Sequence, residues 1–69
     1  PIPFGFRQEG NKLLTDEAEQ DVIRHIKELK RKGLSLRGIA AMLNKEGIPA
    51  KRGGVWYASS VREMVNREG

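Results

Sequence analysis

The pattern that most constrains this chain runs over residues 35–65, where two short helices are predicted on either side of a basic loop. Ser35 is a favoured helix-capping residue, apolar residues follow it at helical spacing, and Gly47 is a typical stop. The buried stripe of this helix is predicted to comprise Leu36, Ile39, Ala40 and Leu43. A further helix is predicted to begin between Ala58 and Ser60, with Val61, Met64 and Val65 on its inner face. Two helices at an angle, the second one exposed, are typical of proteins that reach into the major groove of DNA.

The residues before Ser35 predict a hairpin and one longer helix. Phe4 and Phe6 alternate with small and polar residues in a predicted hairpin over residues 3–14, and two strands alone are not stable. Its aromatic side chains are therefore expected to pack on the helices. A helix is predicted over residues 16–32, capped by Thr15 and ended by Gly33. Its apolar stripe is predicted to comprise Ala18, Val22, Ile23, Ile26 and Leu29. The predicted fold class is mostly α: a short N-terminal hairpin and three helices, the last two forming a helix-turn-helix-like unit with a long basic loop.

The length of 69 residues is enough for one domain with a thin core. Because the chain starts with proline, we expect a single domain over residues 1–69 excised from a longer protein, with residues 15–69 as its helical core. No apolar run approaches the roughly 18–20 residues of a membrane span. Cysteine is absent, which removes disulfides and thiolate metal sites.

Charge is distributed unevenly along the chain. The formal net charge is +4, yet acidic residues predominate up to Ile23 and basic residues predominate from Arg24 onward. A basic C-terminal part indicates a polyanionic partner. The alternative is a solvated surface that only keeps the domain soluble.

Enzymatic chemistry finds little support in the sequence. His25 is the only histidine, and its spacing places it at the edge of the first helix's apolar stripe, where no metal-ligand partner accompanies it. No serine has an accompanying base, and Gly53-Gly54 lacks the features of a phosphate-binding loop. Ser35 is predicted to cap a helix, as is one of the pair Ser59 and Ser60. Neither a cofactor nor a metal is expected.

Several residues have the chemistry of nucleic-acid contacts. Lys51 and Arg52 precede two glycines, and this segment is either a solvated turn or a loop resting on phosphates. Trp56 is predicted to anchor the loop in the core rather than stack on a base, with Tyr57 facing outward towards a phosphate. Arg62, Asn66 and Arg67 are of types that read base edges, although an ordinary solvated helix face is the alternative.

Six segments, together with the acidic start of the first helix, resemble the recombinase domain of serine site-specific recombinases of the resolvase, invertase and large integrase type. They are Pro3–Arg7, Leu34–Ala40, Leu43–Pro49, Arg52–Gly54, Trp56 and Ser59–Arg62. The resemblance implies that the loop and the third helix face DNA. It also implies that residues 1–14 lead to an upstream domain holding the catalytic serine, so this fragment alone is not expected to cleave DNA. Tyr57-Ala58 stands where the family often has Ser-Pro, and Glu63 stands where a basic residue is common. The chain stops before the zinc-ribbon region of large members, so the size class of the parent stays open.

The predicted function is sequence-directed binding of double-stranded DNA that positions a recombinase on its site. The residues predicted to contact phosphates are Ser35, Arg37, Lys51, Arg52 and Tyr57. The residues predicted to approach base edges are Ser59, Ser60, Arg62, Glu63, Asn66 and Arg67. The partners are DNA and the rest of a parent that is dimeric or tetrameric on DNA, in the cytoplasm of a prokaryote or in a phage or mobile-element context. The alternative is a protein-interaction module that supports assembly of the recombinase or docks an acidic partner.

Overall fold

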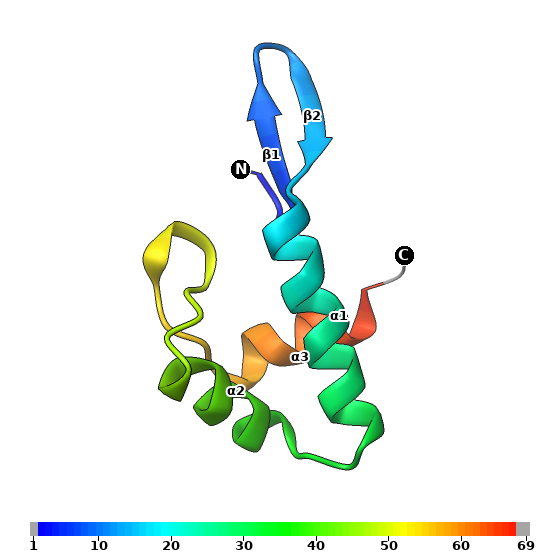
Figure 1. Ribbon diagram of the computed structural model, residues 1–69, viewed down its shortest axis with the longest axis vertical. Helices are drawn as coiled ribbons and strands as arrows, with labels where there is room; N and C mark the ends of the chain where they lie inside the picture. The colour runs from blue at the N-terminus through cyan, green and yellow to red at the C-terminus, as the bar shows by residue number, and fades with distance from the viewer. Residues whose placement is uncertain (1, 68–69) are drawn as a thin grey trace.

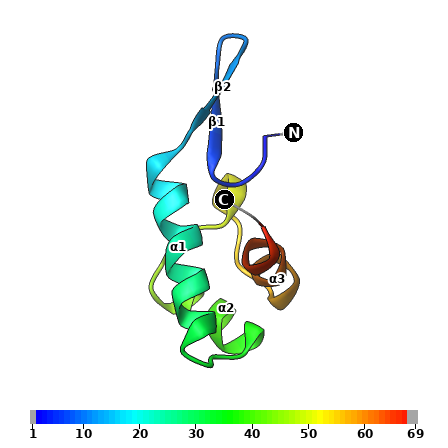
Figure 2. The same ribbon diagram turned by 90° about the vertical axis from the view of Figure 1, so that its right-hand side faces the viewer.

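An N-terminal hairpin followed by three helices makes up the part of the chain that this computed structural model describes, residues 2–67 without the side chain of Arg52 (Figure 1). The mostly α class predicted from the sequence is confirmed. The elements are β1 (Phe6–Glu9), β2 (Lys12–Thr15), α1 (Glu17–Arg31), α2 (Leu36–Lys45), the short 3-10 helix η1 (Lys51–Gly53) and α3 (Ala58–Asn66). α3 lies behind α1 in Figure 1, and Figure 2 shows these two helices on opposite sides with α2 at the lower end.

The hairpin projects from the helices, and most of its residues are exposed. Its antiparallel register runs from Phe6 opposite Thr15 to Glu9 opposite Lys12. The aromatic residue that packs on the helices is Phe4, which precedes β1 and is buried. Its ring lies 5.1 Å from that of Trp56 in an edge-on arrangement. The expected packing of the hairpin aromatics on the helices is therefore confirmed for Phe4, whereas Phe6 is half-buried.

The start of α1 corrects the predicted cap. Thr15 was predicted to be the N-cap, but it pairs with Phe6 and ends strand β2. Asp16 takes the role instead, and its carboxylate accepts a hydrogen bond of 3.1 Å from the Glu19 backbone N–H. The helix accordingly spans Glu17–Arg31 rather than residues 16–32. Strand pairing thus continued one residue further than local propensity indicated.

The capping of the two later helices agrees with the prediction. The Ser35 hydroxyl accepts from the Gly38 backbone N–H at 3.0 Å, and Gly47 follows α2 with a φ of +75°. Before α3, the Ser60 hydroxyl accepts from the Tyr57 N–H at 3.0 Å. Ser60 stands at the third position of α3 and bonds back to the N-cap residue Tyr57, so one of the two serines lines the start of this helix, as expected.

The core lies where the three helices meet the segment around Trp56. Its fully buried members are Ile26 of α1, Ile39 and Leu43 of α2, and Val61 of α3. The predicted stripes of α2 and α3 are confirmed, and that of α1 is confirmed except for Ala18, which is exposed. Within the described residues, no helix has the combined length and hydropathy needed to cross a membrane.

Candidate nucleic-acid interface

Several of the residues predicted to contact DNA lie in two groups around α3, each together with neighbouring residues for which no such contact was predicted. One group, here called the open side, comprises Leu36 and Arg37 of α2 with Ala58, Ser59 and Arg62 of α3. All of these except Arg37 line a depression of about 170 Å³. The other group, here called the paired side, comprises Glu19, Lys51, Glu63 and Arg67. Of these, Lys51 and Glu63 line a hollow of about 250 Å³ beside Phe4 and Trp56.

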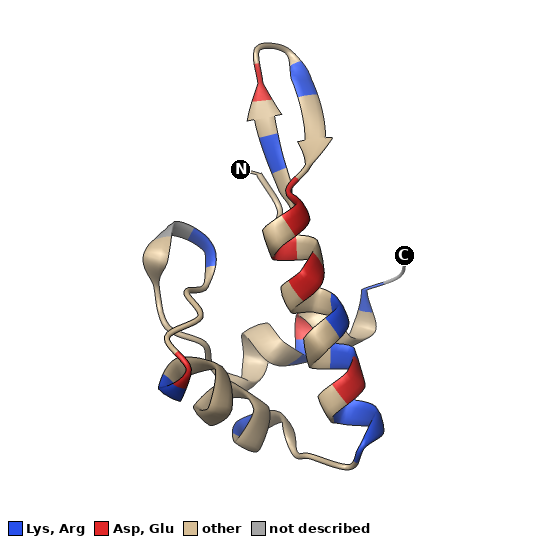
Figure 3. Cartoon of the chain, in the orientation of Figure 1, with Lys and Arg blue, Asp and Glu red and all other residues tan. Residues whose placement is uncertain are grey.

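Arg37 and Arg62 give the open side its positive charge. Both residues are exposed. Within residues 2–67, leaving aside the side chain of Arg52, neither guanidinium lies within 4.0 Å of a carboxylate oxygen. Ser59 and Asn66 are exposed on the same helix as Arg62, at a spacing that places all three on one face. Figure 3 shows where the charged residues lie along the backbone. Acidic residues gather at the hairpin end of α1, and basic residues lie at its other end and on α2.

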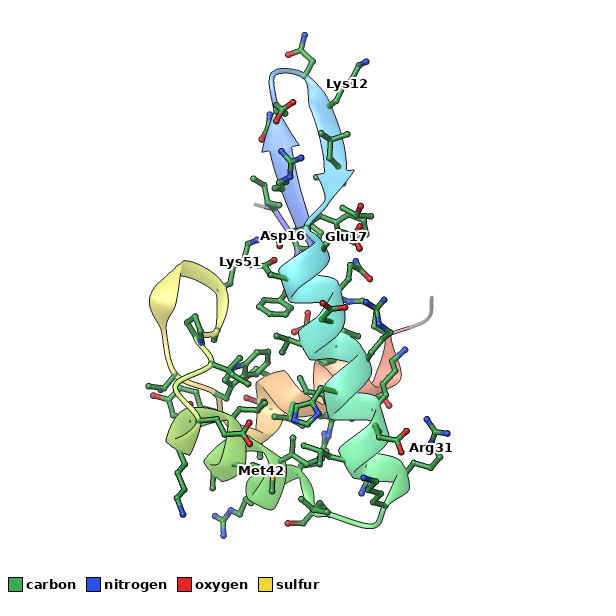
Figure 4. All side chains as sticks on the ribbon, in the orientation of Figure 1. Lys12, Asp16, Glu17, Arg31, Met42 and Lys51 are labelled. Atoms are coloured by element: carbon green, nitrogen blue, oxygen red, sulfur yellow. The ribbon has the colours of Figure 1, made fainter. Side chains whose placement is uncertain are left out.

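Lys51 belongs to the paired side because its ammonium group already has partners. Its Nζ lies 2.9 Å from Glu19 Oε1 and donates to the Phe6 carbonyl at 2.9 Å. The same Glu19 oxygen accepts from the Gly5 N–H at 2.7 Å. Figure 4 shows Lys51 reaching from the loop towards the N-terminal end of α1. One ammonium group therefore joins the loop to α1 and β1, and its predicted contact with phosphate stays a prediction.

Arg67, just after α3, is also engaged within the chain. Its guanidinium donates to the Phe4 carbonyl, and its Nη2 lies 3.4 Å from Glu63 Oε2. Its side chain is only 22% exposed. Arg67 and Glu63 were both predicted to approach base edges, and the structure pairs them with each other. Among the residues that the structure describes, Arg62 has no carboxylate within ion-pair distance, so it is better placed to meet a ligand.

The remaining predicted residues lie in the caps and the connecting loop. The Ser35 hydroxyl caps α2, and the Ser60 hydroxyl, inside the first turn of α3, accepts from the backbone N–H of the N-cap residue Tyr57. Tyr57 is 66% exposed and faces away from the core, whereas its neighbour Trp56 is buried, as the alternation in this extended segment requires. Arg52 was predicted to contact phosphate, and its side chain lies outside the described residues. Its backbone belongs to η1, in the loop that stands beside the helices in Figure 1.

Asn44 is a residue of this region that sequence reasoning missed. Its Oδ1 accepts from the Trp56 N–H at 2.8 Å, and its Nδ2 donates to the Trp56 carbonyl at 2.9 Å. The available signal was a polar amide in the last turn of α2, directly after the buried Leu43. That signal does not identify the hydrogen-bond partner of Asn44, because the partner is twelve residues further along the chain.

The single histidine lies away from this surface. His25 is partly exposed, and its Nε2 lies 3.9 Å from Glu46 Oε1. In the part of the chain that the structure describes, no three His, Cys, Asp or Glu side chains come together as metal ligands would.

Comparison with protein families identifies the class of this domain. The sequence model of the family described as Recombinase matches residues 17–68, which is most of the chain. The chain therefore belongs to the Recombinase family, and this membership gives it a role in site-specific recombination. The match starts at α1 and leaves out the hairpin. No curated protein and no solved structure matches the chain.

Proposed function

We propose that this domain binds double-stranded DNA through the open side and thereby holds a recombinase on its recombination site. The observation that carries the proposal is the pair Arg37 and Arg62, two exposed guanidinium groups from different helices with no carboxylate at ion-pair distance in the described structure. A duplex supplies phosphates for one helix and base edges for the other. The family membership supports the same partner.

Each helix has a distinct role in this proposal. α3 presents Ser59, Arg62 and Asn66 to a groove, because arginine pairs with guanine and asparagine with adenine through two hydrogen bonds each. Arg37, at the start of α2, contacts the phosphate backbone, as the first helix of such a pair does in helix-turn-helix proteins. Residues 1–14 connect the domain to the rest of a parent recombinase. The chemistry of strand cleavage resides in that parent.

The test is a binding titration with the 69-residue chain and two labelled duplexes, one selected from a randomised pool and one of random sequence. Arg62→Ala is expected to lose about 1–3 kcal/mol on the selected duplex and much less on the random one. Arg37→Ala is expected to weaken binding to both duplexes alike and to reduce the slope of log affinity against log salt by about 0.9. Arg24→Ala is the matched control, because Arg24 is an exposed arginine of α1.

Two results would contradict the proposal. Equal losses on both duplexes would remove Arg62 from base recognition. An absence of duplex binding even at low salt would reject the DNA-binding function and favour the protein-interaction alternative.

A further inference from the structure

The connection between α2 and α3 is long, so the chain itself does not dictate how the two helices are oriented. It spans residues 46–57 and includes η1. In a tight helix-turn-helix, a turn of three or four residues sets that angle. Here other contacts must set it. They are the packing of Val61 and Met64 in the shared core, and the contacts that reach the residues directly before α3.

Asn44 makes the contact closest to the start of α3. Its side-chain amide bonds to both backbone groups of Trp56, at 2.8 Å and 2.9 Å, much as a neighbouring β-strand would. Trp56 precedes Tyr57, which is the N-cap residue of α3. One side chain of α2 therefore holds the backbone from which α3 starts.

The side chain of Trp56 strengthens this connection. The indole is buried, packs edge-on against Phe4, and donates from Nε1 to the Ile48 carbonyl at 3.1 Å. The backbone of Trp56 is thus bonded to α2, and its ring is held by Phe4 and by the segment that follows α2. Arg62 lies on the second turn of the helix that follows, so its direction depends on this anchor.

We propose that Asn44 is a positioning residue for base recognition, acting through Trp56 on Ser59 and Arg62 without touching DNA itself. This inference rests on the proposed function. Hydrogen bonds to base edges need side chains held to within about 0.5 Å. Attraction to phosphates is diffuse and tolerates a shift of the helix. Loss of the Asn44 amide is therefore expected to reduce discrimination between DNA sequences while general affinity persists.

The test uses the 69-residue chain and the same selected and random duplexes. Asn44→Ala is expected to lower the ratio of selected to random affinity about tenfold, with random affinity and salt slope unchanged. Asn11→Ala, in the exposed hairpin turn, is the matched control and should leave the ratio as it is. Amide hydrogen exchange at Trp56 is expected to accelerate only in the Asn44 variant. The emission of this single tryptophan shows whether the indole stays buried.

Asn44→Asp is the second variant, used for the decision if Asn44→Ala does not fold. A carboxylate keeps the acceptor for the Trp56 N–H but has no donor for the Trp56 carbonyl. Its added negative charge weakens binding to both duplexes, so the ratio of selected to random affinity still reports on positioning. We expect a ratio between those of the unchanged chain and Asn44→Ala. A folded Asn44 variant that keeps the affinity ratio of the unchanged chain would overturn this inference. The proposed function would still stand if Arg62→Ala loses more affinity for the selected duplex than for the random one. Failure to enrich any duplex would instead overturn the proposed function, and this inference with it.

Discussion

The open and paired sides of α3 both contain basic residues, but within the described residues the cations of the paired side have internal partners and those of the open side have no carboxylate partner. Lys51 and Arg67 are bonded to Glu19, Glu63 and backbone carbonyls. Arg37 and Arg62 are exposed and have no carboxylate within ion-pair distance in the described structure. The paired side ties the N-terminal segment to the helices, whereas the Arg37 and Arg62 side chains of the open side are exposed. Changes on the first should therefore alter stability, and changes on the second should alter binding.

The largest effect on stability is expected for Phe4→Ala. Phe4 is 7% exposed, lines the hollow of the paired side and packs on Trp56. Truncating a buried phenylalanine costs about 3–5 kcal/mol, a large share of the stability of so small a domain. Urea unfolding measures the loss. Leu13→Ala, on the 56% exposed Leu13 of β2, is the control and should change little. A loss below about 1 kcal/mol would show that the packing of Phe4 on Trp56, which borders the paired side, contributes little to the fold.

A smaller loss is expected for Gly5→Ala, where the N-terminal segment contacts α1. Gly5 has a φ of +101°, and an added Cβ would lie 2.8 Å from Gln20 Nε2 and 2.9 Å from Ile23 Cδ1. We expect a cost of about 1–3 kcal/mol in thermal or urea unfolding. Gly10→Ala is a close control, since Gly10 also has a positive φ but nothing within 4 Å of the added atom. Equal costs at the two positions would mean that the contact with α1 contributes nothing.

Glu19→Gln tests whether Lys51 is withheld from DNA. The amide is expected to weaken the bonds to Gly5 and Lys51, lowering stability by about 1 kcal/mol. It also leaves the Lys51 ammonium without its counter-charge, so the salt slope for a random duplex is expected to steepen by about 0.9. Glu17→Gln makes the same charge change two residues away, at an exposed carboxylate of the same helix. Identical slopes in the two variants would show that Lys51 contacts no phosphate even when released.

The smallest effect is expected for Glu63→Gln. Glu63 is 69% exposed, and its pair with Arg67 spans 3.4 Å. Exposed ion pairs contribute about 0–1 kcal/mol, and we expect a change of at most about 0.5 kcal/mol in unfolding. The Phe4 carbonyl remains as a partner for Arg67 in this variant. A loss of 2 kcal/mol or more would show that this pair, rather than Phe4, is the main support of the paired side.

Local patterns in the sequence were sufficient for the helices and most of the core. Ser35, the stripe through Ile39 and Leu43, and Gly47 lie close together in the chain, and each acts on its immediate neighbours. The sequence therefore predicted α2 correctly. The start of α1 was misplaced by one residue because a partner strand, rather than local capping, decided the conformation of Thr15.

The sequence by itself determined the fold class, the capping of α2, the burial of Trp56 and the excess of positive charge. Only the tertiary structure decided which of the described cations are bonded within the chain. Lys51 meets Glu19 across 32 residues, and Arg67 meets the Phe4 carbonyl across 63. It also decided that Asn44 holds the start of α3. Helical periodicity and capping depend on contiguous residues, whereas ion pairs and backbone clamps depend on distances that exist only after the helices have packed.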